Sequence, residues 1–81
     1  MSGPEATAEP VELDERGRLC PLPVISLARA AAGLPAGAVI RLLADDPAAA
    51  LDVPAWCRMR GHQLLAGGDG RFLVRVGGPP S

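Results

Sequence analysis

The sequence contains no lysine and no tyrosine, and it has one residue each of phenylalanine, tryptophan and histidine. Without a lysine amine, Schiff-base catalysis by this chain is excluded. All eight cationic side chains are arginines that form no basic run, and the formal net charge is −1. Because affinity for nucleic acid depends on many Lys/Arg–phosphate contacts, we expect no stable direct nucleic-acid binding.

Cysteine and histidine are also scarce. Cys20 and Cys57 are too far apart for a CxxC pair or for zinc-ligand spacing, and His62 is the one histidine. We therefore expect no metal site and no cofactor. A Cys–His–Asp hydrolase site would require His62 to approach Cys20, and no sequence feature indicates that it does.

Long apolar runs are absent. No segment approaches the ~18 apolar residues of a membrane-spanning helix, and the N-terminus lacks a signal-peptide pattern. We expect no membrane association and a cytoplasmic localisation, with both thiols reduced. The 81 residues predict a single domain over 10–77, near the size at which one core is marginally sufficient. Flexible tails are expected over 1–9 and 78–81.

The periodicity of apolar residues predicts the secondary structure. Strands are expected over 11–14, 38–44, 63–66 and 71–76, and the first helix over 21–32. The segment 47–61 is helical, either as one kinked helix or as two pieces. A turn of about four residues (67–70) joins the last two strands. A helix between the first two strands makes them parallel. The predicted fold is an α/β (α+β) two-layer sandwich of order βαβαββ, a four-stranded mixed sheet with two helices on one face.

A cysteine lies where the first strand, a turn and the first helix meet. Pro21 and Pro23 fit the first turn of the helix, where a missing N–H is tolerated. Cys20 is then the expected N-cap residue, and Gly17 is a candidate for positive φ in the turn. The partial positive charge of the helix N-terminus would lower the thiol pKa from ~8.5 to ~3.5–7.5. The alternative is a small buried hydrophobic residue.

The remaining polar and aromatic residues receive structural interpretations. Capping is the expected role of Asp46, and of Asp52 ahead of a second helix, in preference to metal binding or acid–base work. Cys57 is interpreted as a packed core thiol and His62 as a structural or surface residue. Trp56 and Met59 are expected to pack on the sheet.

Four motifs occur in order along the chain. They are Leu13-Asp14-x-x-Gly17-x-x-Cys20-Pro21-x-Pro23-Val24, Asp45-Asp46-Pro47, Asp52-Val53-Pro54-Ala55-Trp56-Cys57 and Gly61-His62. This series resembles the signature of the TusA/SirA-type sulfur-carrier proteins, and the likeness covers about residues 11–76.

The resemblance implies a function. Cys20 would accept sulfane sulfur as a persulfide from a cysteine desulfurase or another sulfurtransferase and relay it to an acceptor protein. The destinations in such a family include tRNA thiolation, molybdenum-cofactor maturation and sulfur oxidation. Arg16, Arg18 and Arg29 would form a docking rim, and Pro21 and Pro23 would hold the geometry.

Two alternatives stay open at the level of sequence. The first is a redox-sensing or regulatory module in which Cys20 is oxidised, for example to a disulfide with Cys57. The second is a selenium carrier that uses the same thiol.

Overall fold

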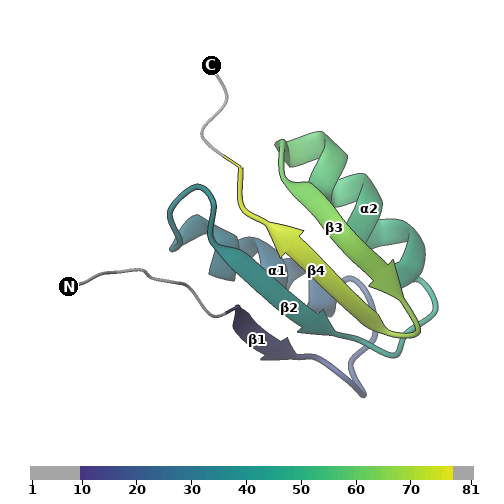
Figure 1. Ribbon diagram of the computed structural model, residues 1–81. Coiled ribbons are helices and arrows are strands. Elements are labelled where there is room, and N and C mark those ends of the chain that lie inside the picture. The colour runs from purple at the N-terminus through teal and green to yellow at the C-terminus, as the bar shows by residue number, and fades with distance from the viewer. Residues whose placement is uncertain (1–9, 78–81) are drawn as a thin grey trace.

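The structure is a computed structural model that describes residues 10–77. Its elements are β1 (Val11–Asp14), α1 (Leu22–Ala32), β2 (Val39–Leu43), α2 (Ala49–Arg60), β3 (Gln63–Gly68) and β4 (Arg71–Arg75) (Figure 1). The predicted order βαβαββ is confirmed. The tails expected over 1–9 and 78–81 lie outside the described residues. Between residues 10 and 77, no helix is long and apolar enough to cross a membrane.

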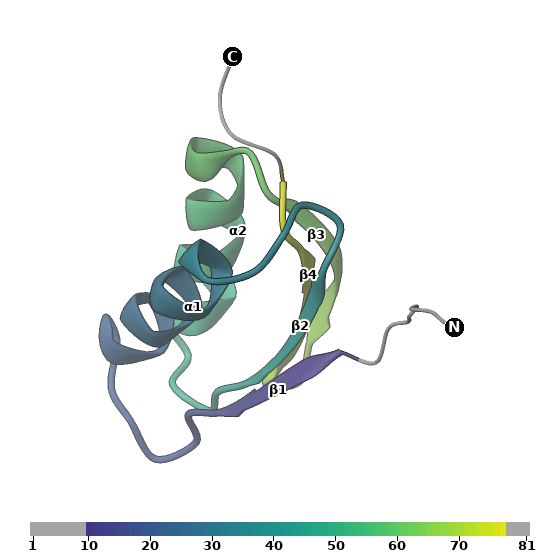
Figure 2. The same cartoon turned by 90° about the vertical axis from the view of Figure 1, so that its left-hand side faces the viewer.

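The sheet has the strand order β1-β2-β4-β3. β1 and β2 are parallel, as expected for strands joined through a helix, and the other two pairs are antiparallel. Both helices cover one face of the sheet and leave the opposite face open (Figure 2). The predicted two-layer sandwich is therefore confirmed.

The core lies between the helices and the covered face of the central strands. Ile40 and Leu42 on β2 are buried and lie opposite Val74 and Phe72 on β4. The alternate positions face the open side, where Arg41 pairs with Leu73. This period-two alternation follows from the pleat of a half-covered sheet.

Helix α1 buries a stripe formed by Pro23, Leu27 and Ala31. The spacing of four residues places the three side chains on one face of the helix, which packs on β2. Gly33 is the C-terminal cap, as predicted, and its N–H donates to the carbonyl of Ala30 at 3.1 Å.

Helix α2 is one continuous helix with Pro54 inside it, which decides between the two sequence interpretations of 47–61. Asp52 lies in its first turn, so the expected role of Asp52 as the cap of a second helix is wrong. Trp56 is buried, whereas Met59 is 74% exposed. The prediction that Met59 packs on the sheet is wrong because it lies on the solvent side of this helix.

The hairpin between β3 and β4 is tighter than predicted. β3 extends to Gly68, and the turn consists of Asp69 and Gly70, with φ of 53° and 76°. Two consecutive positive φ values characterise a type I′ turn, whose twist matches that of the strands. The expected four-residue turn is therefore two residues long.

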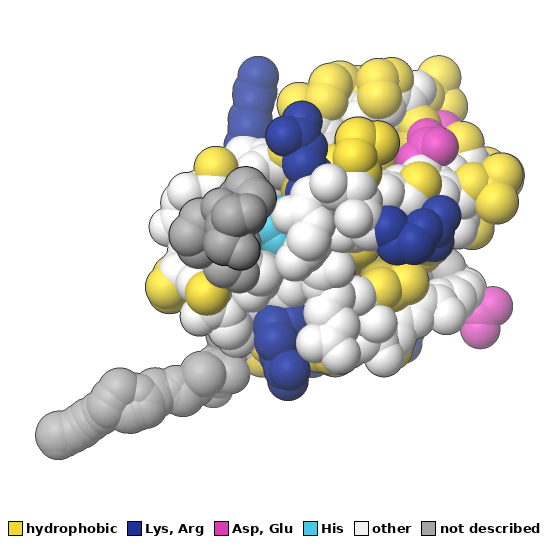
Figure 3. Space-filling model, turned by 90° about the horizontal axis from the view of Figure 1, so that it is seen from above, with side chains coloured by type: hydrophobic (Ala, Val, Ile, Leu, Met, Phe, Trp, Pro, Cys, Tyr) yellow, Lys and Arg dark blue, Asp and Glu magenta, His cyan; other side chains and the backbone are white. Residues whose placement is uncertain are grey.

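His62 has the structural role expected for it. Its Nδ1 accepts a hydrogen bond from the Gly77 N–H at 2.9 Å, and its ring centroid lies 4.6 Å from that of Trp56. The imidazole thus joins the start of β3 to the chain that leaves β4. Figure 3 looks down on this end of the molecule and shows the histidine in cyan, with more arginine than acidic side chains around it.

Candidate functional site

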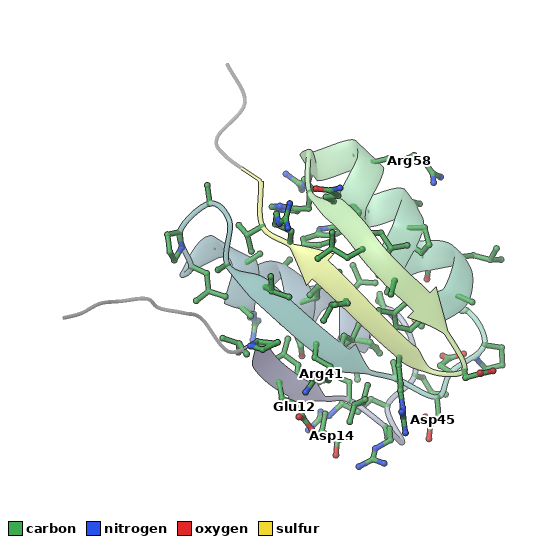
Figure 4. The ribbon with its side chains drawn as sticks, in the orientation of Figure 1. Glu12, Asp14, Arg41, Asp45 and Arg58 are labelled. Carbon is green, nitrogen blue, oxygen red and sulfur yellow. The ribbon has the colours of Figure 1, made fainter. Side chains whose placement is uncertain are left out.

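Cys20 lies in the turn between β1 and α1, at the end of the sheet where β1 and β2 finish. Gly17 in this turn has φ of 84°, which confirms the predicted positive value. The Gly17 N–H donates to the Asp45 carboxylate at 2.8 Å. Asp14 and Asp45 are labelled at this end in Figure 4. This hydrogen bond ties the turn to Asp45, two residues after the end of β2.

The N-terminus of α1 differs by one residue from the prediction. Pro21, not Cys20, is the cap residue, and the helix begins at Leu22. The reason is that the first helical hydrogen bond runs from the Ile25 N–H to the Pro21 carbonyl, at 3.0 Å. Pro23 occupies the first turn, as predicted, and the Cys20–Pro21 peptide bond is cis.

Asp46 holds the backbone on both sides of the site. Its Oδ2 accepts the Cys20 N–H at 2.7 Å, and its Oδ1 accepts the Ala48 N–H at 3.0 Å. These two hydrogen bonds lower the pKa of the Asp46 carboxyl. The predicted capping role is realised at Ala48, and the contact with Cys20 connects the β1–α1 turn to the segment that leads into α2.

The electrostatic surroundings of the thiol are the opposite of those predicted. Cys20 is half-buried and packs against the core. Burial raises the thiol pKa, and the negative charges of Asp46 and Asp52 raise it further. The expected lowering by the helix is wrong because Cys20 lies outside α1 and faces two carboxylates. In the free chain, burial and these carboxylates disfavour the thiolate.

The arginines near the turn are paired with acidic neighbours. Arg16 forms an ion pair with Asp14 at 2.7 Å, and this contact lowers the pKa of Asp14 to about 2. Arg18 lies 3.5 Å from Glu15. Arg29 is exposed on α1 and takes part in none of the ion pairs found between residues 10 and 77.

Glu15 fixes the turn from within. Its N–H donates to the Leu43 carbonyl at 2.7 Å, and its Oε1 accepts the Ser26 hydroxyl at 2.9 Å. One residue thereby connects the end of β1 to both β2 and α1. Sequence reasoning missed this role of Glu15 and the proximity of Asp52 to the thiol. The sequence signal for Asp52 was its place at the start of the third motif.

The other candidate groups lie away from this turn. Cys57 is buried in the core, and burial raises its pKa, which agrees with the predicted packed thiol. His62 precedes β3 and bonds to Gly77, so the structure does not bring it to Cys20. Among the described residues, no group of three or more His, Cys, Asp or Glu side chains is placed to hold a metal ion.

Comparison with known proteins agrees with this arrangement. Residues 11–77 match the family described as Sulfurtransferase TusA. The sulfur carrier protein TusA of Pseudomonas syringae pv. syringae is 40% identical over 67 residues, which cover 80% of each chain. That of Pseudomonas savastanoi pv. phaseolicola is 35% identical over 78 residues, which cover 85% of this chain and 93% of the relative.

A solved structure shows the same fold. The crystal structure of a SirA-like protein from Desulfitobacterium hafniense superposes with a TM-score of 0.64 at 29% identity, covering 84% of this chain and 97% of that chain. The family match over residues 11–77 extends from β1 to the end of β4 and includes the turn that carries Cys20. The cysteine turn, the βαβαββ fold and these likenesses together show that the chain belongs to the TusA family of sulfur carriers.

Proposed function

We propose that Cys20 is the residue on which this family member carries sulfur, as a persulfide. The observation that supports the assignment is the contrast between the two thiols. Cys20 lies in a surface turn next to the exposed side chain of Leu19, whereas Cys57 is buried in the core. A carrier thiol has to reach the active sites of other proteins, which favours the half-buried Cys20 over the buried Cys57.

The transfer is a sulfane-sulfur exchange that leaves the overall oxidation state unchanged. The Cys20 thiolate attacks the outer sulfur of a persulfide R–S–SH on the donor. A new S–S bond forms at Cys20, the donor's S–S bond breaks, and the donor leaves as the thiolate R–S⁻. The proton released from the Cys20 thiol passes to solvent or to a base of the donor. The reverse exchange with an acceptor discharges the carrier.

The proposed donor is a cysteine desulfurase or another sulfurtransferase, and the proposed acceptor is a downstream sulfur-relay protein. The destinations suggested by the family are tRNA thiolation, molybdenum-cofactor maturation and sulfur metabolism. A cytoplasmic location suits this chemistry, because a reducing compartment keeps the carrier thiol free between transfers. We retain Arg29 as a docking residue because it is exposed on α1.

Intact-mass measurement tests the assignment. The wild-type chain, Cys20→Ser and Cys57→Ser are incubated with a cysteine desulfurase and free cysteine. We expect a gain of one sulfur atom, reversible by dithiothreitol, in the wild type and in Cys57→Ser but not in Cys20→Ser. A gain that is lost in Cys57→Ser and kept in Cys20→Ser would falsify the assignment.

The same samples address the alternatives. A redox sensor that pairs the two cysteines would lose two hydrogen atoms under mild peroxide and gain no sulfur from the donor. The buried position of Cys57 opposes this pairing, because the core would have to open before a disulfide formed. Selenium carriage would appear as a mass gain of selenium when the donor is supplied with selenocysteine and would leave Cys20 as the acceptor.

A further inference from the structure

The surface that borders Cys20 is rich in exposed leucines. Leu19 is 74% exposed, Leu22 is 45% exposed and Leu51 is 77% exposed. Leu19 and Leu22 flank the cysteine along the chain, and the Leu22 N–H donates to the Leu19 carbonyl at 3.0 Å. Leu51 directly precedes Asp52, whose carboxylate interacts with the thiol. We call these three side chains the leucine rim.

This clustering around the thiol needs an explanation. Single exposed apolar residues are common on protein surfaces, but several around one reactive group are typical of a contact site. Because these three leucines are exposed, they contribute little to the hydrophobic core of the free chain. Contact with another protein would remove them from water.

The same end of the molecule carries an excess of negative charge. The turns and termini around Cys20 hold six carboxylates and three arginines: Asp14, Glu15, Asp45, Asp46, Asp52 and Asp69, with Arg16, Arg18 and Arg71. Arg16 and Arg18 are compensated by ion pairs with Asp14 and Glu15. Asp46 and Asp52, here called the carboxylate pair, belong to none of the ion pairs between residues 10 and 77.

The opposite end has the opposite sign. Arg58 and Arg60 lie in the last turn of α2, and Arg75 ends β4. Figure 4 labels Arg58 at the far end of α2 from Asp45, and Figure 3 shows arginines gathered on that face. The charge asymmetry orients an approaching partner by its own charge. A partner with basic side chains is drawn to the end that carries Cys20.

We infer that the protein that exchanges sulfur with Cys20 docks on the leucine rim and presents an arginine or lysine side chain to the carboxylate pair. This inference rests on the proposed function and specifies the chemistry of its partner. The apolar contact supplies affinity, and the cation selects the partner and its orientation.

Docking of this kind also changes the reactivity of the thiol. In the free chain the carboxylate pair disfavours the thiolate. A partner cation placed between the carboxylates and the sulfur offsets their charge and lowers the thiol pKa. The thiolate would thus form mainly in the complex, where the donor persulfide or the acceptor is at hand. The free carrier would be protected from stray oxidants and electrophiles.

Two kinds of sulfur donor separate docking from thiol chemistry. The first is a cysteine desulfurase that charges the wild-type chain, and the second is sodium polysulfide, which needs no docking surface. Leu51→Ser is compared with Met59→Ser, because both residues are exposed on α2 at opposite ends of the helix, at 77% and 74%. Asp52→Asn is compared with Glu12→Gln, which lies beside Arg41 on the open face of the sheet.

We expect Leu51→Ser and Asp52→Asn to lower kcat/KM for the desulfurase by about tenfold each, the loss of about 1.4 kcal/mol of contact. Both controls should stay within about twofold of wild type, the range of a neutral surface substitution. Polysulfide should load Leu51→Ser at the wild-type rate and Asp52→Asn at least as fast.

Two results would overturn the docking inference and leave the proposed function standing. One is protein-donor transfer at the wild-type rate in both Leu51→Ser and Asp52→Asn. The other is an equal loss with desulfurase and polysulfide, which would place the effect in the thiol itself. If Cys20 in the wild-type chain took sulfur from neither donor, the proposed function itself would be refuted.

Discussion

At the scale of single residues, the site depends on what surrounds one sulfur atom. Cys20 stands two residues before α1, yet the charges that act on its thiol are carboxylates from the β2–α2 connection and the first turn of α2. A helix N-terminus acts within the first turn, and here Pro21 takes the cap position. Partial burial, followed by the two nearby negative charges, raises the pKa of the thiol.

The first prediction concerns the pH dependence of this thiol. Alkylation by iodoacetamide follows the thiolate fraction, so its rate in Cys57→Ser should reach half-maximum at a pH above that of an ordinary cysteine. Asp52→Asn in the same background removes one of the charges that raise the pKa. Its half-maximum should shift to lower pH, and alkylation at pH 7 should be about two- to tenfold faster, as expected for a shift of up to one pH unit.

The matched control for this measurement is Asp69→Asn, which keeps the two-residue turn because asparagine tolerates a positive φ. Its pH profile should match that of Cys57→Ser alone. An unchanged profile in Asp52→Asn would show that its carboxylate does not act on the thiol.

At the scale of elements, hydrogen bonds between segments far apart in sequence hold the two ends of the sheet. At the Cys20 end, the Asp46 carboxylate bridges the β1–α1 and β2–α2 connections. At the other end, Gly61 closes α2 in the left-handed region, with φ of 77°. The chain then passes through His62, which bonds to Gly77 beyond β4.

The second prediction tests the close approach of Gly77, after β4, to Gly61 at the end of α2. A Cβ at Gly77 would overlap the carbonyl oxygen of Gly61, whereas a Cβ at Gly33 would meet nothing closer than 3.8 Å. We expect Gly77→Ala to lower the free energy of unfolding by about 1–3 kcal/mol, the usual cost of overpacking. Gly33→Ala should stay within about 0.5 kcal/mol of wild type.

Urea unfolding followed by Trp56 fluorescence provides the measurement, since this one tryptophan stacks against His62 beside this close approach. Equal stability of the two variants would mean that the chain after β4 adjusts without cost. The close approach to Gly61 would then not be needed for the fold.

At the scale of the whole molecule, the chain is a thin sandwich with one covered and one open face. Its buried core is small, as expected for a domain of this length. Part of its stability therefore depends on surface turns and on the carboxylates that anchor them. This dependence couples the stability of the fold to pH.

The third prediction follows from the lowered pKa values of Asp14 and Asp46. A carboxyl group whose pKa is lower in the folded than in the unfolded state stabilises the fold fully above its ordinary value of 3.8. This contribution is lost as the pH falls through the folded-state pKa, about 2 for Asp14. The free energy of unfolding should thus decline from about pH 4 toward pH 2.

Urea titrations at fixed ionic strength between pH 2 and pH 7 measure this decline. In Asp46→Asn the acid-dependent part should become smaller, because the group that takes up a proton on unfolding has been removed. A slope identical to that of wild type would show that Asp46 is not perturbed in the folded chain.

The sequence by itself determined the order of the elements, the inward faces of the central strands and the place of Cys20 between β1 and α1. These follow from local patterns: the alternation in β2 and β4, the four-residue spacing of Leu27 and Ala31, and the two prolines that follow Cys20. It also determined the family, because the motifs lie in order along the chain. Local stereochemistry and burial are sufficient for all of these.

The tertiary structure alone decided the sign of the charge around that cysteine. The Asp46 carboxylate that accepts the Cys20 N–H is 26 positions away along the chain. The positive charges of Arg16 and Arg18 are offset by ion pairs with Asp14 and Glu15, which depend on where these side chains point. Electrostatic energy depends on distances in space, and chain pattern does not contain them. For that reason the sequence pointed to Cys20, and only the fold showed that carboxylates rather than arginines act on its thiol.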